Sequence, residues 1–318
     1  MKRFFILATA AIVALASCAK TEVVYKDGPQ EIAFKKISGV MTKADPTLDQ
    51  LNDGSMGVFA NYYENSTIGE AYFVNKEFAK GTTYWSGGQY WPLSGELIFA
   101  VYAPHVDDAT PKVVDWDKSG KTLTINADNA SAQTDWLYGT SLPTGSKSSE
   151  HVDVNLAHAL SLIEVNVTGE NAKLISVELL QTVQKATGVV TYNNPVEVDW
   201  TPAASSPRAS ELTLWEPTGD PVPTSVDLTE SALSGTLYVV PTTSLSIEAI
   251  RLTYTLGTSS EELIYTTKTS PDNDLGNTWV HGKKYIYNID IQPKQILFDP
   301  TVTDWAAGNS GDTTISVN

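Results

Sequence analysis

The chain contains one cysteine, Cys18, and its surroundings decide which chemistry the thiol can do. Lys2 and Arg3 precede an uncharged, mostly apolar run from Phe4 to Ala16. A basic start, a short apolar run and small residues before a cut are typical of an export signal. The run has 13 residues, fewer than the roughly 20 that a membrane-spanning helix needs. Because a lone thiol in an exported protein has no disulfide partner within the chain, another modification of Cys18 is expected.

The residues around that thiol suggest lipid attachment. Leu15-Ala16-Ser17-Cys18 resembles the lipobox of bacterial lipoproteins. The resemblance implies that residues 1–17 are removed and that Cys18 becomes an acylated N-terminus, carrying chains such as palmitate, at the outer membrane. One acyl chain anchors a protein only marginally, whereas three hold it durably. The alternative is an ordinary signal peptide that happens to contain a cysteine.

A second chemical event is predicted at Lys43. Pro46 forces Asp45 into an extended conformation, and a basic residue in an extended segment suits a trypsin-like maturation protease, so the mature chain would begin at Ala44. The alternative is an ordinary lysine in a loop. Between Cys18 and this point, Glu31 to Lys35 alternates apolar and polar residues, as a half-buried strand does. Residues 18–43 are therefore interpreted as a lipidated pro-segment that contains a first strand, with Ile32 and Phe34 on its buried face.

Motifs for other chemistry are missing or weak. The four histidines have no metal-ligand spacing, and the sequence has no phosphate-binding glycine loop and no nucleophile elbow. Asp272-Asn273-Asp274 lacks the spacing of a calcium loop and is interpreted as an acidic turn, with calcium binding as the alternative. No metal and no cofactor is therefore expected. The histidines are His105, His151, His158 and His281.

The chain is rich in tryptophan, which raises the question of sugar binding. Aromatic faces bind glycans, but the positions of these residues in and next to expected strands favour core packing. A glycosidase would need two carboxylates at a defined separation, and an acidic sequence offers such pairs without any specificity. The tryptophans are Trp85, Trp91, Trp116, Trp136, Trp200, Trp215, Trp279 and Trp305.

Composition and charge narrow the class of protein. The 318 residues are 42% hydrophobic and 18% charged, with a formal net charge of −16, which is typical of a globular chain. Removal of residues 1–43 takes away seven basic and three acidic residues, so that the remainder carries 14 basic and 34 acidic residues, a net charge of −20. Such a charge disfavours nucleic-acid binding and favours solubility outside the cell.

From Leu51 onward the sequence predicts short strands separated by turns. Leu97 to Tyr102 is nearly continuously apolar, as a central strand would be, and Gly87-Gly88 suits a tight hairpin between two aromatic segments. Two series of alternating segments divide near Gly169. Strands with turn signals every 8–12 residues indicate β-sandwiches or barrels, and each of the two series can bury its alternating face against a second sheet. We therefore expect an all-β protein with an N-terminal sandwich over 44–169 and a C-terminal sandwich over 170–318.

Several motifs are spread over nearly the whole chain: the lipobox, Glu31–Phe34, Thr42–Ala44, Tyr90–Pro92, Phe99–Pro104, Asp135–Gly139, Leu156–Ser161, Gly282, Tyr285–Ile289 and Val302–Trp305. Together they resemble the fimbrillin family, the pilin-like lipoproteins of type V pili in Gram-negative anaerobes. The resemblance implies two transthyretin-like β-sandwich domains in tandem, no catalysis, removal of the first strand by a protease, and polymerisation by donor-strand exchange with copies or paralogues of the subunit in a stalk, tip or anchor position. His158 lies where the family has a histidine and is interpreted as structural.

The resulting hypothesis is a structural subunit of a cell-surface fimbrium whose C-terminal tail, residues 294–318, enters the groove of a neighbour. Alternatively, this tail is the last strand of its own domain. Two other function classes stay open: a fimbrial tip adhesin or free-standing surface lipoprotein that binds glycans or host protein, and a secreted carbohydrate-active enzyme. The candidate donor residues are Ile296, Phe298, Val302, Ile315 and Val317.

Overall fold

The computed structural model describes residues 28–37, 54–128, 132–183, 185–193, 195–203, 210–219, 221–229, 232–241, 248–268, 278–292, 295–304 and 315–316. Every regular element in these ranges is a β-strand, so the all-β prediction is confirmed. The alternating segments form strands because each places one row of side chains in a core and the other row outward. Within the same ranges, no helix has the length and apolar character needed to cross a membrane.

The largest sheet has nine strands and belongs to the N-terminal half of the chain. Strands β2 and β5 are buried over most of their length, which confirms that the apolar run at Leu97 to Tyr102 is a central strand. The sheet order is β10 (Val152–Val154), β1 (Glu31–Ile37), β4 (Trp85–Tyr90), β3 (Thr67–Lys80), β2 (Ser55–Glu64), β5 (Glu96–Ala103), β8 (Leu137–Gly139) and β11 (Leu156–His158), with β9 (Thr144–Ser146) also paired to β5.

This sheet curls so that β1 faces β5 across a core. In a flat sheet the two strands would lie four spacings, or about 19 Å, apart. Instead the ring centroids of Phe34 on β1 and Phe99 on β5 are 5.3 Å apart. We call the core enclosed by the curl the inner core; it also contains Met56, Val58 and Trp85. The curl explains how one sheet can bury β1 completely.

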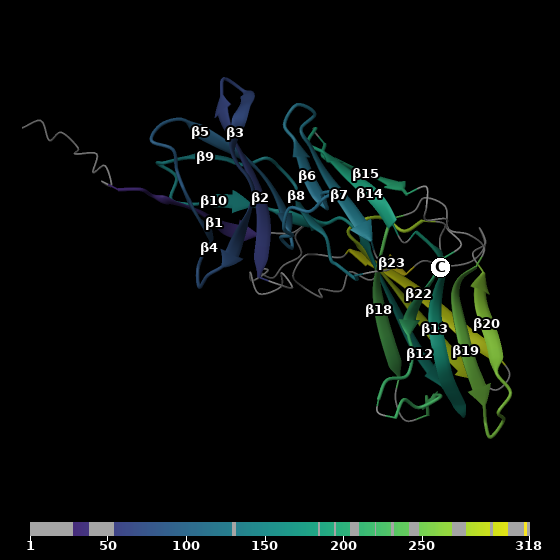
Figure 1. Ribbon diagram of the computed structural model, residues 1–318. Helices are drawn as coiled ribbons and strands as arrows, with labels where there is room; N and C mark the ends of the chain where they lie inside the picture. The colour runs from purple at the N-terminus through teal and green to yellow at the C-terminus, as the bar shows by residue number, and fades with distance from the viewer. Residues whose placement is uncertain are drawn as a thin grey trace, which may run out of the picture.

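A four-stranded sheet covers the opposite face of β2 and β5. Its order is β15 (Glu197–Pro202), β14 (Lys185–Thr191), β7 (Thr122–Asp128) and β6 (Val114–Asp117). A second core lies between the sheets, with Phe59 and Tyr102 from one side and Leu123, Ile125 and Val190 from the other. Figure 1 shows these four strands side by side, between the strands of the nine-stranded sheet and the rest of the chain.

The C-terminal half is a sandwich of two five-stranded sheets around a third core, which includes Ile163, Val177, Leu252 and Tyr287. The long β12 and β21 pair in parallel at its centre, and Figure 1 shows this sandwich at the lower right. One sheet has the order β18 (Leu233–Val239), β12 (Ser161–Gly169), β21 (Lys283–Gln292), β22 (Gln295–Asp304) and β23 (Ile315–Ser316). The other has the order β16 (Ser210–Trp215), β13 (Ala172–Thr182), β19 (Glu248–Leu256) and β20 (Leu263–Lys268), with β17 (Val226–Asp227) paired to β13.

Strand pairing crosses the predicted boundary at residues 169 and 170 in both directions. Strand β12 lies before the boundary and pairs with β18 and β21 of the C-terminal sandwich. Strands β14 and β15 lie after it, and β14 pairs with β7 of the N-terminal half. Pairing alone does not say which segments fold independently, so the division into domains 44–169 and 170–318 stays a prediction.

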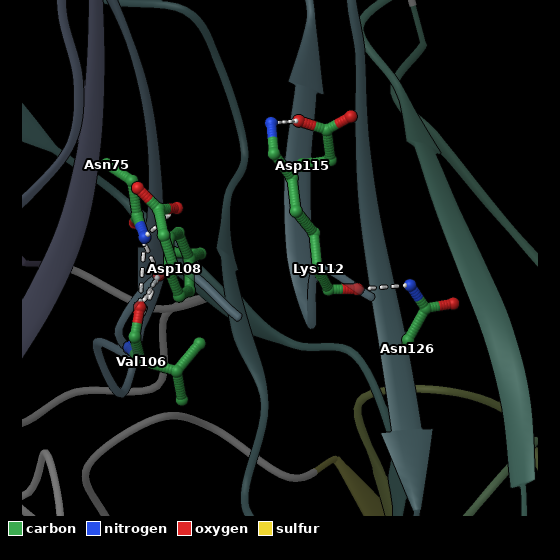
Figure 2. Close-up of polar contacts among 7 residues, drawn as sticks. Asn75, Val106, Asp108, Lys112, Asp115 and Asn126 are labelled. Carbon is green, nitrogen blue, oxygen red and sulfur yellow. Dashed lines mark hydrogen bonds and ion pairs between the residues drawn. The ribbon is translucent and has the colours of Figure 1, made fainter. Parts of the chain in front are cut away.

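The loop between β5 and β6 is fastened to β3 by Asn75 (Figure 2). Asn75 has a left-handed backbone with φ 45°, which asparagine tolerates better than most residues. Its Nδ2 donates to the Val106 carbonyl and to Asp108 Oδ1, both at 2.9 Å, while its Oδ1 accepts a 2.6 Å hydrogen bond from the Tyr102 hydroxyl. The loop therefore has a defined conformation where it leaves the central strand.

The same loop is held from β7 at its other end. The side-chain amide of Asn126 donates to the Lys112 carbonyl at 2.9 Å, and the Lys112 ammonium contacts Asp115 at 2.7 Å (Figure 2). The hydrogen bond to Asp115 raises the pKa of Lys112. Because β3 and β7 belong to different sheets, the loop ties the two N-terminal sheets together.

The two halves of the chain meet around the segment 158–161. The Gly282 amide donates to the Leu160 carbonyl at 2.9 Å, and Ser161 Oγ donates to the Val280 carbonyl at 2.8 Å. The His281 ring lies 6.5 Å from the Tyr138 ring. Burial lowers the pKa of His281, so its imidazole is neutral at neutral pH. The hydrogen bond from Gly282 to Leu160 and the packing of His281 on Tyr138 therefore join the halves.

Candidate functional site

Strand β1 lies in a groove between β10 and β4. It runs parallel to β10, with Phe34 opposite Val152, and antiparallel to β4, with Phe34 opposite Trp85. A short strand with a partner on each side has its backbone groups hydrogen-bonded in both directions. Strand β1 thus closes a gap between two strands that lie far apart in the sequence.

The side chains of β1 fill the inner core. Ile32 and Phe34 have no exposed surface, which agrees with the expected buried face of this strand. The Phe34 ring makes edge-to-face contacts with Phe78 and Phe99, with centroid distances of 5.1 and 5.3 Å. Burial of each such side chain stabilises a protein by about 1.5–3 kcal/mol. Among the side chains of β1 that the structure describes, these two therefore account for most of the apolar attachment.

Polar contacts fix the beginning of β1. The Trp91 amide donates to the Gln30 carbonyl at 2.9 Å, and Gln30 Nε2 donates to the Ser149 carbonyl at 2.8 Å. The Gly88 amide donates to Glu31 Oε1 at 2.9 Å. All three contacts bind the strand to the residues on its two sides, so they define its position along the groove.

The predicted hairpin at Gly87-Gly88 is wrong. Both glycines lie inside β4, where the register with β1 shifts between Glu31 and Ala33. A Cβ at Gly87 would collide with the Glu77 carbonyl, and Gly88 has φ 65°, so the pair forms an irregularity in the strand. The glycines therefore bend β4 around β1 instead of ending it.

The candidate donor residues lie in the other half of the chain. Strand β22 pairs with β21 along its whole length, which places Ile296 opposite Ile291, Phe298 opposite Ile289 and Val302 opposite Tyr285. Ile296 and Val302 pack partly buried against the C-terminal core. In this structure β22 therefore follows the stated alternative, a strand of its own sheet.

The end of the tail is described at Ile315 and Ser316 alone. These two residues form β23 and pair with β22 at Val302 and Thr301, with Ile315 opposite Val302. None of the four candidate donor residues that the structure describes, Ile296, Phe298, Val302 and Ile315, pairs with β1. Four of the predicted site residues lie outside the described residues: Cys18, Lys43, Ala44 and Val317.

The positions of the tryptophans support core packing over sugar binding. Each of the seven tryptophans that the structure describes lies in a hydrophobic core or packs against one.

The side chain of His158, on strand β11, contacts that of Asp135, which precedes β8. The distance from His158 Nδ1 to Asp135 Oδ1 is 2.8 Å, and both side chains are nearly buried. Within the described ranges no group of three or more metal-ligating residues is found. Asp272 to Asp274 lie outside those ranges.

Sequence reasoning missed two parts of this groove. Strand β10 is a short apolar alternation, Val152 and Val154, and nothing in it signals a parallel partner more than a hundred residues earlier. The tryptophans of the groove wall, Trp85 and Trp91, were recognised as core residues but not as neighbours of β1. Their place beside the Gly87-Gly88 pair is the one signal that marks an irregular strand.

One comparison with known proteins identifies a family. A family model described as fimbrillin-like matches residues 42–305. No curated protein matches the chain. Among solved structures, a fimbrial protein from Bacteroides vulgatus is 16% identical, with a TM-score of 0.54 over 87% of this chain and 99% of that one.

Two further structures have the same fold. A protein from Bacteroides ovatus that is proposed to act in cell adhesion is 14% identical, with a TM-score of 0.57 over 87% of this chain and 98% of its own. A protein from Bacteroides uniformis with the same description is 15% identical, with a TM-score of 0.56 over 88% and 99%. At these identities the likeness shows the fold alone.

Proposed function

Because this chain belongs to the fimbrillin-like family, we propose that it is a structural subunit of a cell-surface fimbrium. In this proposal the chain is exported as a lipoprotein acylated on Cys18 and is held at the outer membrane. A protease then cleaves after Lys43, and subunits polymerise by donor-strand exchange. The partners in the polymer are copies or paralogues of the subunit. The family consists of fimbrial proteins and is not a family of enzymes.

The seating of β1 is the observation that carries the proposal. The strand lies between two strands of the same sheet, fills the inner core with Ile32 and Phe34, and ends at Ile37, six residues before Lys43 in the sequence. Cleavage after Lys43 would leave β1 held by non-covalent contacts alone. Its departure would expose apolar pockets and the unpaired backbone of β4 and β10, which is a site suited to strand addition.

We propose the end of the tail, with Ile315 and Val317, as the donor in preference to β22. Strand β22 is integrated in the sheet of its own sandwich, whereas the described residues of β23 pair with β22 at two positions. Removing β23 would cost few hydrogen bonds, because it lies at the edge of its sheet. Ile315 and Val317 keep the two-residue spacing of Ile32 and Phe34, which a strand needs to fill the same pockets.

Maturation and assembly can be tested together on protein recovered from cells. N-terminal sequencing of surface material should give Ala44, and electron microscopy should show filaments. A Lys43→Ala variant should stay uncut and monomeric, while Cys18→Ala should lose labelling by a fatty-acid analogue. Filaments built from uncut Lys43→Ala protein would contradict the proposal. Recovery only of protein starting at acylated Cys18 would point to an anchor subunit.

One surface feature favours a second candidate function, a tip adhesin or free-standing lipoprotein that binds a glycan or host protein. Tyr62 and Tyr90 are 40% and 47% exposed. Tyr72 lies beside them, with its ring 5.3 Å from Tyr62 and its hydroxyl donating to the Tyr90 carbonyl at 2.8 Å. Grouped aromatic rings can stack on sugars or on a partner protein. Binding on a glycan array that is lost in Tyr62→Ala and kept in Leu93→Ala would support this role.

A further inference from the structure

The groove around β1 contains polar atoms that the resident strand leaves unsatisfied. The indole nitrogens of Trp85 and Trp91 are buried and have no hydrogen-bond partner in the described part of the chain. The two residues are 0% and 5% exposed, so solvent does not replace the missing acceptor. An indole nitrogen can only donate, and buried tryptophans normally find a partner. Two such donors in one groove therefore need an explanation.

The position of Trp85 relates this unsatisfied donor to the exchangeable strand. Trp85 lies directly opposite Phe34 in the pairing of β1 with β4. Opposite residues of an antiparallel pair point to the same face, with Cβ atoms about 4.5–5.5 Å apart. The inward side chains that β1 places there, Ile32 and Phe34, consist of carbon and hydrogen only. Strand β1 thus fills the groove but offers the indole no side-chain acceptor.

Trp91 repeats the arrangement near the start of the strand. Its backbone amide binds the Gln30 carbonyl, and its ring packs edge-to-face on Phe99 at a centroid distance of 5.8 Å. Phe99 in turn contacts Phe34. Trp85 therefore borders the space that would be vacated if β1 left, and Trp91 packs on Phe99, which borders the same space.

We propose that Trp85 is a specificity-determining residue for the incoming strand. This inference rests on the strand-exchange function proposed above. The occupant that fits the groove best is a strand of a paralogous fimbrial subunit that keeps the alternating apolar row and adds a short oxygen-bearing side chain, such as threonine or serine, against the indole. The tail of a second copy, with Ile315 and Val317, would fill the same pockets without supplying this acceptor. A strand that supplies this acceptor binds about tenfold more tightly than a carbon-only strand of the same shape. Strand β1 is then a resident that the correct partner can displace.

The first test uses the intact chain and does not depend on exchange. Valine and threonine have nearly the same shape, so Ile32→Val is compared with Ile32→Thr, and Phe34→Val with Phe34→Thr, by urea denaturation. Each pair is measured with Trp85 present and in a Trp85→Phe background that lacks the indole N–H. In the Trp85→Phe background, threonine should lower the folding equilibrium constant about tenfold relative to valine, because its hydroxyl is buried without a partner. With Trp85 present, this deficit should disappear at one of the two positions.

A spectroscopic readout identifies the hydrogen bond itself. In protein with ¹⁵N-labelled tryptophan, the indole proton resonance of Trp85 should move downfield in the threonine variant that recovers stability, and should stay in place in its valine counterpart. This comparison requires only variants that retain Trp85. An unchanged resonance together with an equal threonine deficit in both backgrounds would overturn the inference.

The second test measures exchange. The full exported chain is cleaved after Lys43 and mixed with synthetic peptides of residues 28–40 that carry valine or threonine at the position identified above. The threonine peptide should displace β1 about tenfold more effectively, and Trp85→Phe protein should lose this preference. Displacement by both peptides without preference would overturn the inference and leave the proposed function in place. If neither peptide displaces β1 while threonine still recovers stability in the intact chain, the proposed function fails and the hydrogen-bonding role of Trp85 stands.

Discussion

Phe34 shows how much of the attachment of β1 depends on one side chain. It is completely buried and packs edge-to-face on Phe78 and Phe99, so Phe34→Ala leaves a cavity in the inner core. We expect the free energy of unfolding of the uncleaved chain to fall by about 3–5 kcal/mol, measured by urea denaturation. Lys35→Ala is the matched control, because Lys35 is exposed and only its ammonium approaches the Tyr84 ring, at 5.9 Å. Equal losses in the two variants would show that β1 is not seated as described.

Tyr102 makes a prediction about alkaline pH. Burial raises the pKa of Tyr102 from 10.0 to about 12, since the charged phenolate is disfavoured in the core. A raised pKa in the folded state gives stability that is complete below pH 10 and is lost as the pH rises toward 12. Over this interval the free energy of unfolding of the wild type should fall by up to roughly 2.7 kcal/mol more than that of Tyr102→Phe.

The same substitution has a separate effect below pH 10. Tyr102→Phe removes the donor to Asn75 Oδ1, so the variant should already be less stable at neutral pH, by about 1–3 kcal/mol. Other buried tyrosines, including Tyr138 and Tyr285, have raised pKa values too, and they contribute equally to both proteins. Parallel stability curves for wild type and variant above pH 10 would contradict the assignment to Tyr102.

At the residue scale, the sequence predicted burial better than it predicted neighbours. The alternation at Ile32 and Phe34 predicted one buried face, and both residues are buried. The same alternation gives no information on which strand lies beside it, because register and partner depend on contacts far apart in the sequence. Sequence reasoning therefore could not predict that Phe34 lies opposite Trp85. For the same reason it could not predict the hydrogen bonds that Asn75 makes to the loop after β5.

At the scale of elements, the two parts of the tail should behave differently on truncation. Deletion of residues 305–318 removes β23, an edge strand with two pairing positions. We expect this variant to be secreted with nearly wild-type stability and to fail to polymerise. Deletion of residues 294–318 also removes β22, which pairs along its whole length with β21, so the C-terminal sandwich should lose stability as well.

Thermal unfolding and electron microscopy of both truncated proteins, after cleavage at Lys43, separate these outcomes. If the protein lacking residues 305–318 polymerised as well as the untruncated protein, the donor would not be the segment with Ile315 and Val317. Filaments from the longer deletion would remove the tail from the mechanism altogether. Untruncated, cleaved protein is the control for both measurements.

The sequence predicted which segments form strands better than it predicted the order of those strands in the sheets. Leu97 to Tyr102 gives a central strand because its apolar residues have no polar alternation, and β5 is indeed buried on both faces. The Gly87-Gly88 pair misled because glycine serves both hairpin turns and strand irregularities. The return of β14 and β15 to the N-terminal half follows from packing on the core around Tyr102 and Ile125, which no local pattern announces.

At the scale of the whole molecule, charge should govern the rate of assembly. The chain after residue 43 carries a net charge of −20, so two cleaved subunits repel each other before any strand is exchanged. Salt screens this repulsion, since the Debye length is about 30 Å at 0.01 M ionic strength and about 10 Å at 0.1 M. We therefore expect the bimolecular rate of polymer formation, followed by light scattering, to rise about tenfold between these two salt concentrations.

Release of β1 should respond differently, because its attachment is mainly apolar. Ile32 and Phe34 are buried in the inner core, and Phe34 packs on the uncharged rings of Phe78 and Phe99. The first-order release of β1 from cleaved protein, followed with a fluorophore on the cleaved peptide, should therefore change less than about twofold over the same salt range. If polymer formation slowed as salt was added, attraction between complementary charges at the subunit contact would outweigh the overall repulsion. If both rates rose together, charge would act on the groove itself and not on the approach of two subunits.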